Sequence, residues 1–283
     1  MKRLLMALVI VSGCSDSDDQ SILTLEMTAL PALGSDFVYE GWLVGQSGPT
    51  STGRFTVDGS GMMSRDQFEV EAALADEADA AVITIEPAVG DDPAPSATHI
   101  LAGELDGLSA VLSIADDRAL GTDFAGADGT FLLATPSTSE DMSDQLQGIW
   151  WLMGDPPVAS LSLPTLPDGW LYEGWIATAD QATSTGKFAR PDQIDDDGAG
   201  PTAGPDDAPP FPGQDFIDPP ITLGPSFQAV VTIEPDPDDS PEPFQVKPLI
   251  DESIAAVPAP TLQEMANRAA ATAPAGQAFL DLD

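Results

Sequence analysis

Short runs of aromatic and β-branched residues, separated by Gly, Pro, Ser and Asp, make up most of the chain. The runs FVYEGWLV and WLYEGWIA are typical, and AAVITIEP, LSAVLSI, GTFLLATP and GIWWLMG follow the same rule. Short runs of this composition, with turn residues at both ends, predict β-strands. Many such strands at nearly regular spacing predict an antiparallel sandwich or barrel.

Two segments of this strand pattern occur twice along the chain. FVYEGWLVGQSGPTSTGRF at residues 37–55 returns as WLYEGWIATADQATSTGKF at residues 170–188, an offset of 133. AVITIEPAVGDDPAP at residues 81–95 returns as AVVTIEPDPDDSPEP at residues 229–243, an offset of 148. Self-similarity of this kind indicates a duplicated module. We therefore predict an all-β fold of two tandem antiparallel β-sandwich (Ig-like) domains from an internal duplication, with a short C-terminal helix.

The repeat also predicts how the chain is divided. We expect a signal peptide at residues 1–13, an acidic tether at residues 14–21, and β-sandwich modules at residues 22–154 and 155–283. The second copy carries the extra residues, which fall in a Pro-, Gly- and Asp-rich stretch at 190–220. No periodic apolar pattern survives in that stretch, so it reads as a long, acidic surface loop.

Helical periodicity is scarce. SEDMSDQLQ at residues 139–147 is expected to form one or two turns with Ser139 as the cap. TLQEMANRAAATA at residues 261–273 places Thr261 and Glu264 in a capping arrangement and predicts the C-terminal helix.

One acidic residue in each copy stands among apolar neighbours on its predicted strand. Alternate residues face opposite sides of a strand, and both faces of these two strands are mostly apolar. A buried carboxylate costs several kcal/mol unless it is paired or hydrogen-bonded. We expect the partners to come from residues 51–54 and 184–187, which offer hydroxyls, turn amides and a cation, while a catalytic or ligand-binding acid in each copy is the alternative. The structural repeat pairs are Glu40 and Glu173, Trp42 and Trp175, and Arg54 and Lys187.

The N-terminal residues are typical of an export signal. Lys2 and Arg3 precede an apolar run from Leu4 to Val11, which is too short to span a bilayer, and small residues follow before Cys14. This order resembles a bacterial lipoprotein signal peptide, which implies lipid attachment at Cys14. An ordinary secretory signal with an incidental cysteine is the alternative. We expect an exported chain that is lipid-anchored to the cell envelope, at the outer membrane or the cell surface.

The charge balance restricts the partners. The chain carries 47 acidic and 9 basic residues, for a formal net charge of −38. Such a surface repels nucleic acids and anionic headgroups, so we expect no nucleic-acid partner. The same bias is similar to that of proteins from salt-loving (halophilic) organisms, in which salt screens the repulsion between carboxylates. A generally acidic envelope protein is the alternative.

Histidine and cysteine, which often catalyse reactions or bind metal ions, are almost absent from the chain. His99 is the sole histidine and Cys14 the sole cysteine, which leaves no warrant for a Ser-His-Asp triad or a zinc site. No glycine-rich phosphate loop follows a predicted strand. Residues 192–200 cluster Asp side chains, but their spacing fails the EF-hand pattern. We expect no cofactor, and calcium at this Asp-rich loop is the alternative to a solvated loop.

The adjacent residues Trp150 and Trp151 should face opposite sides of a strand. The outward ring is expected to be buried between the modules. An aromatic platform for a glycan or protein partner is the alternative.

YEGWL and STGRF, together with GTFLLATP and GIWWL, resemble the extracytoplasmic β-sandwich module of anti-sigma-K-factor-like proteins. The resemblance implies an envelope regulator; in that family a cytoplasmic helical region holds a sigma factor and a membrane helix joins it to this module. Only thirteen residues precede Cys14, so sigma-factor binding is not expected here. We expect a non-enzymatic envelope protein whose modules bind a protein or polysaccharide partner. An anti-sigma-like regulatory or sensory protein and a glycan-acting enzyme are the alternatives.

Overall fold

The computed structural model describes residues 20–237 and 240–282. The expected signal peptide, Cys14 and most of the expected tether therefore lie outside the described residues. The last two residues of the expected tether already belong to the first strand, β1 (Gln20–Thr28), and the Ser21 side chain is fully buried. The first module thus begins slightly earlier than the apolar pattern predicts.

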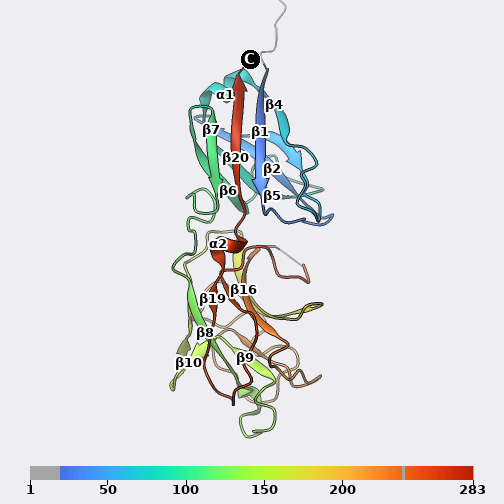
Figure 1. The fold of residues 1–283 in the computed structure, drawn as a ribbon, viewed down its shortest axis with the longest axis vertical. Helices are drawn as coiled ribbons and strands as arrows, with labels where there is room; N and C mark the ends of the chain where they lie inside the picture. Colours follow the sequence, from blue (N-terminus) through green and yellow to red (C-terminus); the bar gives the residue numbers. More distant parts are fainter. Residues whose placement is uncertain (1–19, 238–239, 283) are drawn as a thin grey trace, which may run out of the picture.

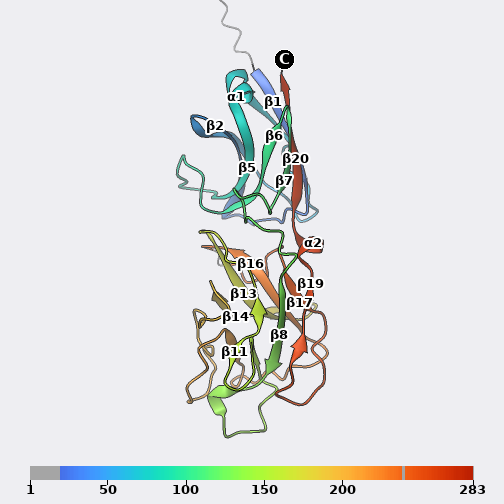
Figure 2. The ribbon, with the colours of Figure 1, turned by 90° about the vertical axis from the view of Figure 1, so that its left-hand side faces the viewer.

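The molecule is elongated, with two β-rich lobes stacked along its long axis (Figures 1 and 2). Among the described residues every strand pairing is antiparallel and strands far outnumber helices, which confirms the all-β prediction. Within the described residues, no helix has the length and apolar character that a bilayer crossing requires.

The first lobe is a single eight-stranded sheet with the order β3-β2-β5-β6-β7-β20-β1-β4. The sheet curls so that the Phe55 ring on one edge strand lies 6.0 Å from the Phe68 ring on the other. Helix α1 (Ala72–Glu77) follows the last edge strand. Besides β1, the strands are β2 (Phe37–Gly45), β3 (Gly48–Phe55), β4 (Gln67–Glu71), β5 (Ala78–Pro87), β6 (His99–Asp106), β7 (Ser109–Ser113) and β20 (Ala275–Leu282).

The second lobe contains a five-stranded sheet of order β14-β13-β16-β17-β19 and a facing group of order β12-β8-β9-β15, in which β18 also pairs with β8. A two-stranded ribbon joins β10 to β11. The strands are β8 (Asp128–Leu133), β9 (Gly148–Trp150), β10 (Leu152–Met153), β11 (Val158–Ala159), β12 (Leu161–Ser162), β13 (Trp170–Ala177), β14 (Ala182–Phe188), β15 (Gly213–Asp215), β16 (Gln228–Pro235), β17 (Leu249–Asp251), β18 (Gln263–Glu264) and β19 (Ala266–Asn267).

The strand pairing crosses the division that the repeat suggests between residues 154 and 155. β20, from the end of the chain, inserts between β1 and β7 of the first lobe. β8, from the first half of the chain, inserts between β12 and β18 of the second lobe. Each half of the sequence therefore gives its last long strand to the other lobe, as the red β20 in the upper lobe of Figure 1 shows.

Strand β2 is covered on both faces, as its apolar pattern predicts. Tyr39 and Leu43 belong to the main core, while Trp42 on the opposite face packs with Val82 and Ala119. β13 repeats this pattern, with Tyr172 and Trp175 both buried.

The helices are shorter than the sequence predicts. Of the expected helix at residues 261–273, only α2 (Ala269–Thr272) is helical, because residues 263–264 and 266–267 pair as β18 and β19 instead. Residues 139–147 form turns after a 3-10 helix, η1 (Pro136–Thr138). In both segments a pairing or packing partner outweighs a weak local preference.

Candidate functional site: the duplicated polar networks

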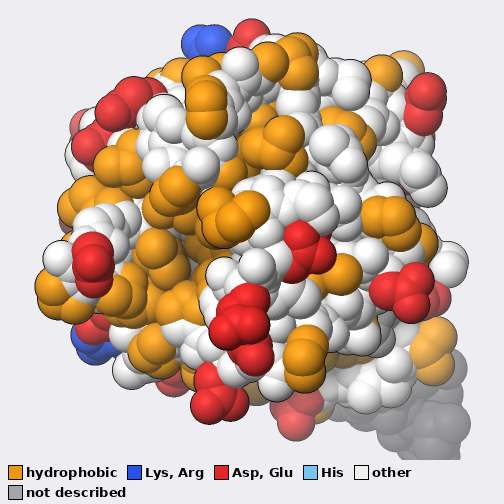
Figure 3. Space-filling view, turned by 90° about the horizontal axis from the view of Figure 1, so that it is seen from below, with side chains coloured by type: hydrophobic (Ala, Val, Ile, Leu, Met, Phe, Trp, Pro, Cys, Tyr) orange, Lys and Arg blue, Asp and Glu red, His pale blue; other side chains and the backbone are white. Residues whose placement is uncertain are grey.

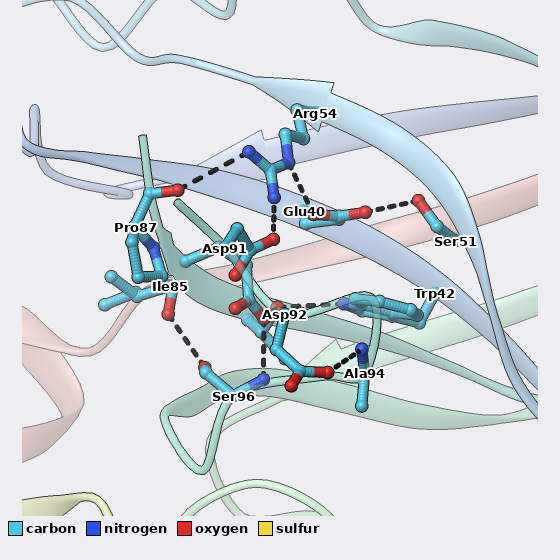
Figure 4. A network of polar contacts seen from close by, with 12 residues as sticks. Glu40, Trp42, Ser51, Arg54, Ile85, Pro87, Asp91, Asp92, Ala94 and Ser96 are labelled. Carbon is cyan, nitrogen blue, oxygen red and sulfur yellow. Dashed lines mark hydrogen bonds and ion pairs between the residues drawn. The ribbon is translucent and has the colours of Figure 1, made fainter. Parts of the chain in front are cut away.

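Glu40 on β2 lies in a polar network that its own repeat supplies. Its side chain is almost fully buried. The Ser51 hydroxyl donates a hydrogen bond to Oε1, and the Arg54 Nε donates to Oε2 at 2.7 Å. The same guanidinium also pairs with Asp91 and reaches the Pro87 carbonyl (Figure 4). Both oxygens of the carboxylate thus have donors from the segment that the sequence pattern predicts.

Glu173 on β13 has an equivalent set of partners. The Ser184 hydroxyl donates to its Oε1 at 2.5 Å, and the Lys187 ammonium lies 3.9 Å from Oε2. The Glu173 side chain is as buried as that of Glu40. The hydroxyl contact is therefore kept in both copies, whereas the cation makes a closer contact in the first.

Each Trp of the repeat is linked through a threonine hydroxyl to a second buried carboxylate. The Trp42 Nε1 donates to the Thr84 hydroxyl at 2.9 Å, and that hydroxyl donates to Glu86 Oε1. The Ser96 amide donates to the same oxygen at 2.9 Å, which closes the loop after β5 onto the strand (Figure 4). Glu86 is fully buried, and its Oε2 has no hydrogen-bond partner among the described residues.

The second lobe repeats this chain of contacts. Trp175 Nε1 donates to the Thr232 hydroxyl at 2.8 Å, Thr232 donates to Glu234, and the Phe244 amide donates to the same carboxylate at 2.9 Å. Ser96 and Phe244 are 148 positions apart, the offset between β5 and β16. The network therefore keeps a backbone donor at this position although the side chain differs.

The repeat offset also identifies the counterpart of His99 in the second copy. The offset of 148 that relates β5 to β16 pairs it with Lys247. His99 Nδ1 lies 2.6 Å from the Arg118 carbonyl, while the Lys247 ammonium donates to the Phe244 carbonyl at 2.6 Å. Burial lowers the pKa of Lys247, and the nearby Glu234 carboxylate opposes that shift.

Glycine and tyrosine positions of the repeat serve the same architecture. The pairing of β2 with β3 shifts register after Gly41, and that of β13 with β14 shifts around Gly174, so each glycine lies at a β-bulge. The Tyr39 hydroxyl donates to the Pro31 carbonyl at 2.9 Å, and the Tyr172 hydroxyl donates to its counterpart Pro164 at 2.6 Å. Burial raises the pKa of both phenols.

Trp150 and Trp151 are both 0% exposed, which rules out the expected alternative of an aromatic platform. Trp150 Nε1 donates to Asp215 at 2.8 Å, and Trp151 Nε1 donates to Thr185 at 3.3 Å. Both rings lie inside the second lobe rather than between lobes. Gly213 of β15, from the inserted stretch, lies against the Trp150 ring, and the Trp151 ring packs against Phe131 of β8. Residues 190–220 are thus not only a surface loop.

The acidic part of that stretch is partly buried as well. Asp195 Oδ2 accepts a hydrogen bond from the Gly213 amide at 2.9 Å, and burial raises the pKa of Asp195 to about 7. Burial and the neighbouring Asp196 raise the pKa of Asp197 to about 6. Within the described residues, no group of three His, Cys, Asp or Glu side chains could hold a metal ion.

Three main surface hollows are found among the described residues. One of about 530 Å³ lies between the lobes, where Phe37 and Ile85 of the first lobe face Pro235 and Phe244 of the second. Neither it nor the two other main hollows is lined by Glu40, Glu86, Glu173 or Glu234. Through their hydrogen bonds, the four carboxylates link strands and loops of their own repeats.

Comparison with known proteins gives one match. No curated protein and no solved structure matches the chain. Residues 9–99 match the family model of the anti-sigma-K factor rskA, C-terminal. This segment is about a third of the chain and includes β1 to β5 with the whole first network. Over that segment, the chain resembles the C-terminal region of anti-sigma-K factors.

Proposed function

We propose that the chain is a non-enzymatic regulatory protein of the bacterial envelope, exported by its N-terminal signal, anchored by lipid on Cys14, and active by binding a protein partner. The observation that carries this proposal is the match of residues 9–99 to the anti-sigma-K factor family. The matched segment contains strands β1 to β5 of the first lobe, so the likeness concerns the part that lies outside the cytoplasm in that family.

The geometry of the networks supports a binding role over a catalytic one. The repeat carboxylates accept hydrogen bonds from their own module and are buried. A catalytic acid must reach a bound substrate at hydrogen-bond distance. The surface supports a protein partner rather than a nucleic acid, because acidic side chains are spread among hydrophobic ones at the free end of the second lobe (Figure 3).

The regulatory role is tested by comparing transcripts of a strain that lacks the chain with those of its parent. We expect a change in one set of genes controlled by a single sigma factor, restored by the intact chain. An unchanged transcript profile under envelope stress, with the protein present in the parent, would contradict the regulatory role.

The anchor is tested separately with Cys14→Ser. We expect the intact chain to appear in the membrane fraction with a lipid-modified Cys14 in mass spectrometry, and the variant to leave that fraction. An unmodified Cys14 on a membrane-bound chain would overturn the anchor but not the regulatory role.

A further inference from the structure

We propose that the position of β20 between β1 and β7 is an assembly site that accepts the C-terminal strand of a second copy of this chain. Two copies would exchange their last strands, so that each first lobe is completed by the partner. This inference rests on the strand pairing and is independent of the proposed function.

β20 is an inner strand of the first lobe and is paired along both of its edges. β20 pairs with β1 from Ser21↔Leu282 to Thr28↔Ala275, and with β7 from Ser113↔Ala275 to Ser109↔Phe279. The inward residue Ala278 is 0% exposed. A first lobe without this strand would have two unpaired inner edges and an open core, which is the condition under which an added strand binds.

The exchange is reciprocal within one chain. β8 of the first half lies between β12 and β18, as β20 of the second half lies between β1 and β7. Phe131 and Leu132 of β8 precede Phe279 and Leu280 of β20 by 148 positions, the offset that relates β5 to β16. The tandem chain thus contains the pairing that two separate modules would form by trading their last strands.

The connection to β20 permits the trade between chains. α2 ends at Thr272, and only Ala273 and Pro274 separate it from β20. An exchanged pair would make the same strand contacts as the closed monomer, so the two states differ mainly in this hinge, in the second crossing between the lobes at residues 114–127, and in the entropy of association. Proline restricts the backbone of the hinge, which reduces the entropy lost when it straightens.

Charge sets the conditions for the exchange. Each copy has a formal net charge of −38, so two copies repel each other at low ionic strength. Salt shortens the range of that repulsion to about 3 Å at 1 M. We therefore expect exchange to increase with salt and with protein concentration during refolding.

Two single-cysteine chains test the exchange. Both carry Cys14→Ser; one has Thr24→Cys and the other, with a different tag, has Phe279→Cys. Thr24 and Phe279 are paired across β1 and β20, and directly opposed residues in antiparallel strands are close enough for a disulfide. Because each chain has one thiol, this disulfide requires β20 of one copy beside β1 of the other. After joint refolding at high salt, we expect a mixed disulfide at least about fivefold above the control described next.

The control replaces Thr24→Cys by Thr28→Cys, which is paired with Ala275 and lies about 13 Å out of register with position 279. A chain that carries both Thr24→Cys and Phe279→Cys should close its own disulfide as a monomer. If it does so and the mixed disulfide stays at the level of the control, the exchange is overturned. If the double variant does not close, the register that supports the proposal is itself wrong.

Discussion

The two lobes hold the same buried network with different outer contacts. Ser51 and Ser184 donate to the repeat carboxylate in both lobes, and each repeat Trp donates to a Thr that in turn binds a second Glu. The cation is Arg54 in one lobe and a more distant Lys in the other. The comparison shows that the groups that satisfy buried carboxylates are kept, while contacts nearer to solvent vary.

The two lobes also differ in the side chain that fills the space beside the second glycine of the repeat, Gly53 in the first copy and Gly186 in the second. A Cβ on Gly53 would meet the guanidinium of Arg65, whereas a Cβ on Gly186 would meet the carboxyl of Asp195. The first lobe therefore closes this position with a cation that also lies 4.2 Å from the Phe68 ring centroid. The second lobe closes it with the inserted acidic stretch. An acid here brings a pH dependence that a cation does not.

The largest expected difference between the lobes follows from their bulge glycines. A Cβ on Gly174 would lie 2.6 Å from the buried Trp151 Nε1 and would also meet Thr185. One on Gly41 would lie 2.6 Å from Thr52 Oγ1, and its other neighbours lie at ordinary contact distances of 3.7 and 3.8 Å. Because a hydroxyl moves more easily than a packed indole, we expect Gly174→Ala to lower the free energy of unfolding by about 3 kcal/mol and Gly41→Ala by about 1 kcal/mol. Urea unfolding of both variants measures this, and equal losses would contradict the comparison.

The second expected difference concerns the two cations. Arg54→Met removes a hydrogen bond and charge partner at 2.7 Å from Glu40, while Lys187→Met removes a charge partner at 3.9 Å from Glu173. We expect losses of about 2 and about 1 kcal/mol in the free energy of unfolding, because leaving a buried carboxylate short of donors is costly. Arg190→Met, which removes an exposed ion pair with Asp192, is the control and should change little. A larger loss for Lys187→Met would reverse this ranking.

The third difference is the pH dependence of the second lobe. The pKa of Asp195 is raised to about 7 in the fold, against about 3.9 in an unfolded chain. The folded state therefore binds more protons between those values, and stability falls as pH rises from about 4 to about 7. We expect the stability of Asp195→Asn to fall less with pH than that of the parent. Relative to the parent, the free energy of unfolding of the variant should be about 1 kcal/mol higher at pH 8 than at pH 4.

Thermal unfolding of Asp195→Asn and its parent across this pH range measures the effect. Asp192→Asn, at an exposed position in the same stretch, is the matched control. A parent whose stability does not fall between pH 4 and pH 7 more steeply than that of Asp195→Asn would contradict the assignment.

The smallest expected effects are those of the second carboxylates, and they too differ between the two lobes. Glu234 lies near enough to Lys247 to affect its pKa, whereas the equivalent position near Glu86 holds His99. We expect Glu234→Gln to cost about 1 kcal/mol and Glu86→Gln to be neutral or stabilising by up to about 1 kcal/mol, because it removes a fully buried charge and keeps an acceptor for Thr84. Equal effects in urea unfolding would show that Lys247 does not matter.

Much of the candidate site could be read from the sequence. Two short sequence motifs, repeated at a fixed offset, predicted that Glu40 and Glu173 are buried and that Ser51 and Ser184 are near them. The reason is local: β2 and β3, and likewise β13 and β14, are neighbouring strands joined by a short turn, so pairing brings these residues together. Glu86 and Glu234 were missed, although each stands two residues after a Thr in the repeated TIEP, where a carboxylate can reach that hydroxyl on the same strand face.

Other features needed contacts between distant segments. The burial of Trp150 depends on Gly213 and its neighbours, which are separated from it by a long stretch without any apolar period. The helix expected at residues 261–273 was replaced by pairing of Gln263 with Phe131 and of Asn267 with Leu249. Local propensity is a weak guide where such pairing is available.

The sequence by itself determined the all-β character, the duplication, the strong negative charge and the pairing of each first carboxylate with its own repeat, because these depend on periodicity, composition and neighbouring strands. Only the tertiary structure decided which lobe receives β8 and which receives β20. The two strands share the Phe-Leu pair at the repeat offset, so each carries a similar pattern for either position. The choice depends on the paths of the two crossings between the lobes, and strand patterns contain no information about those paths.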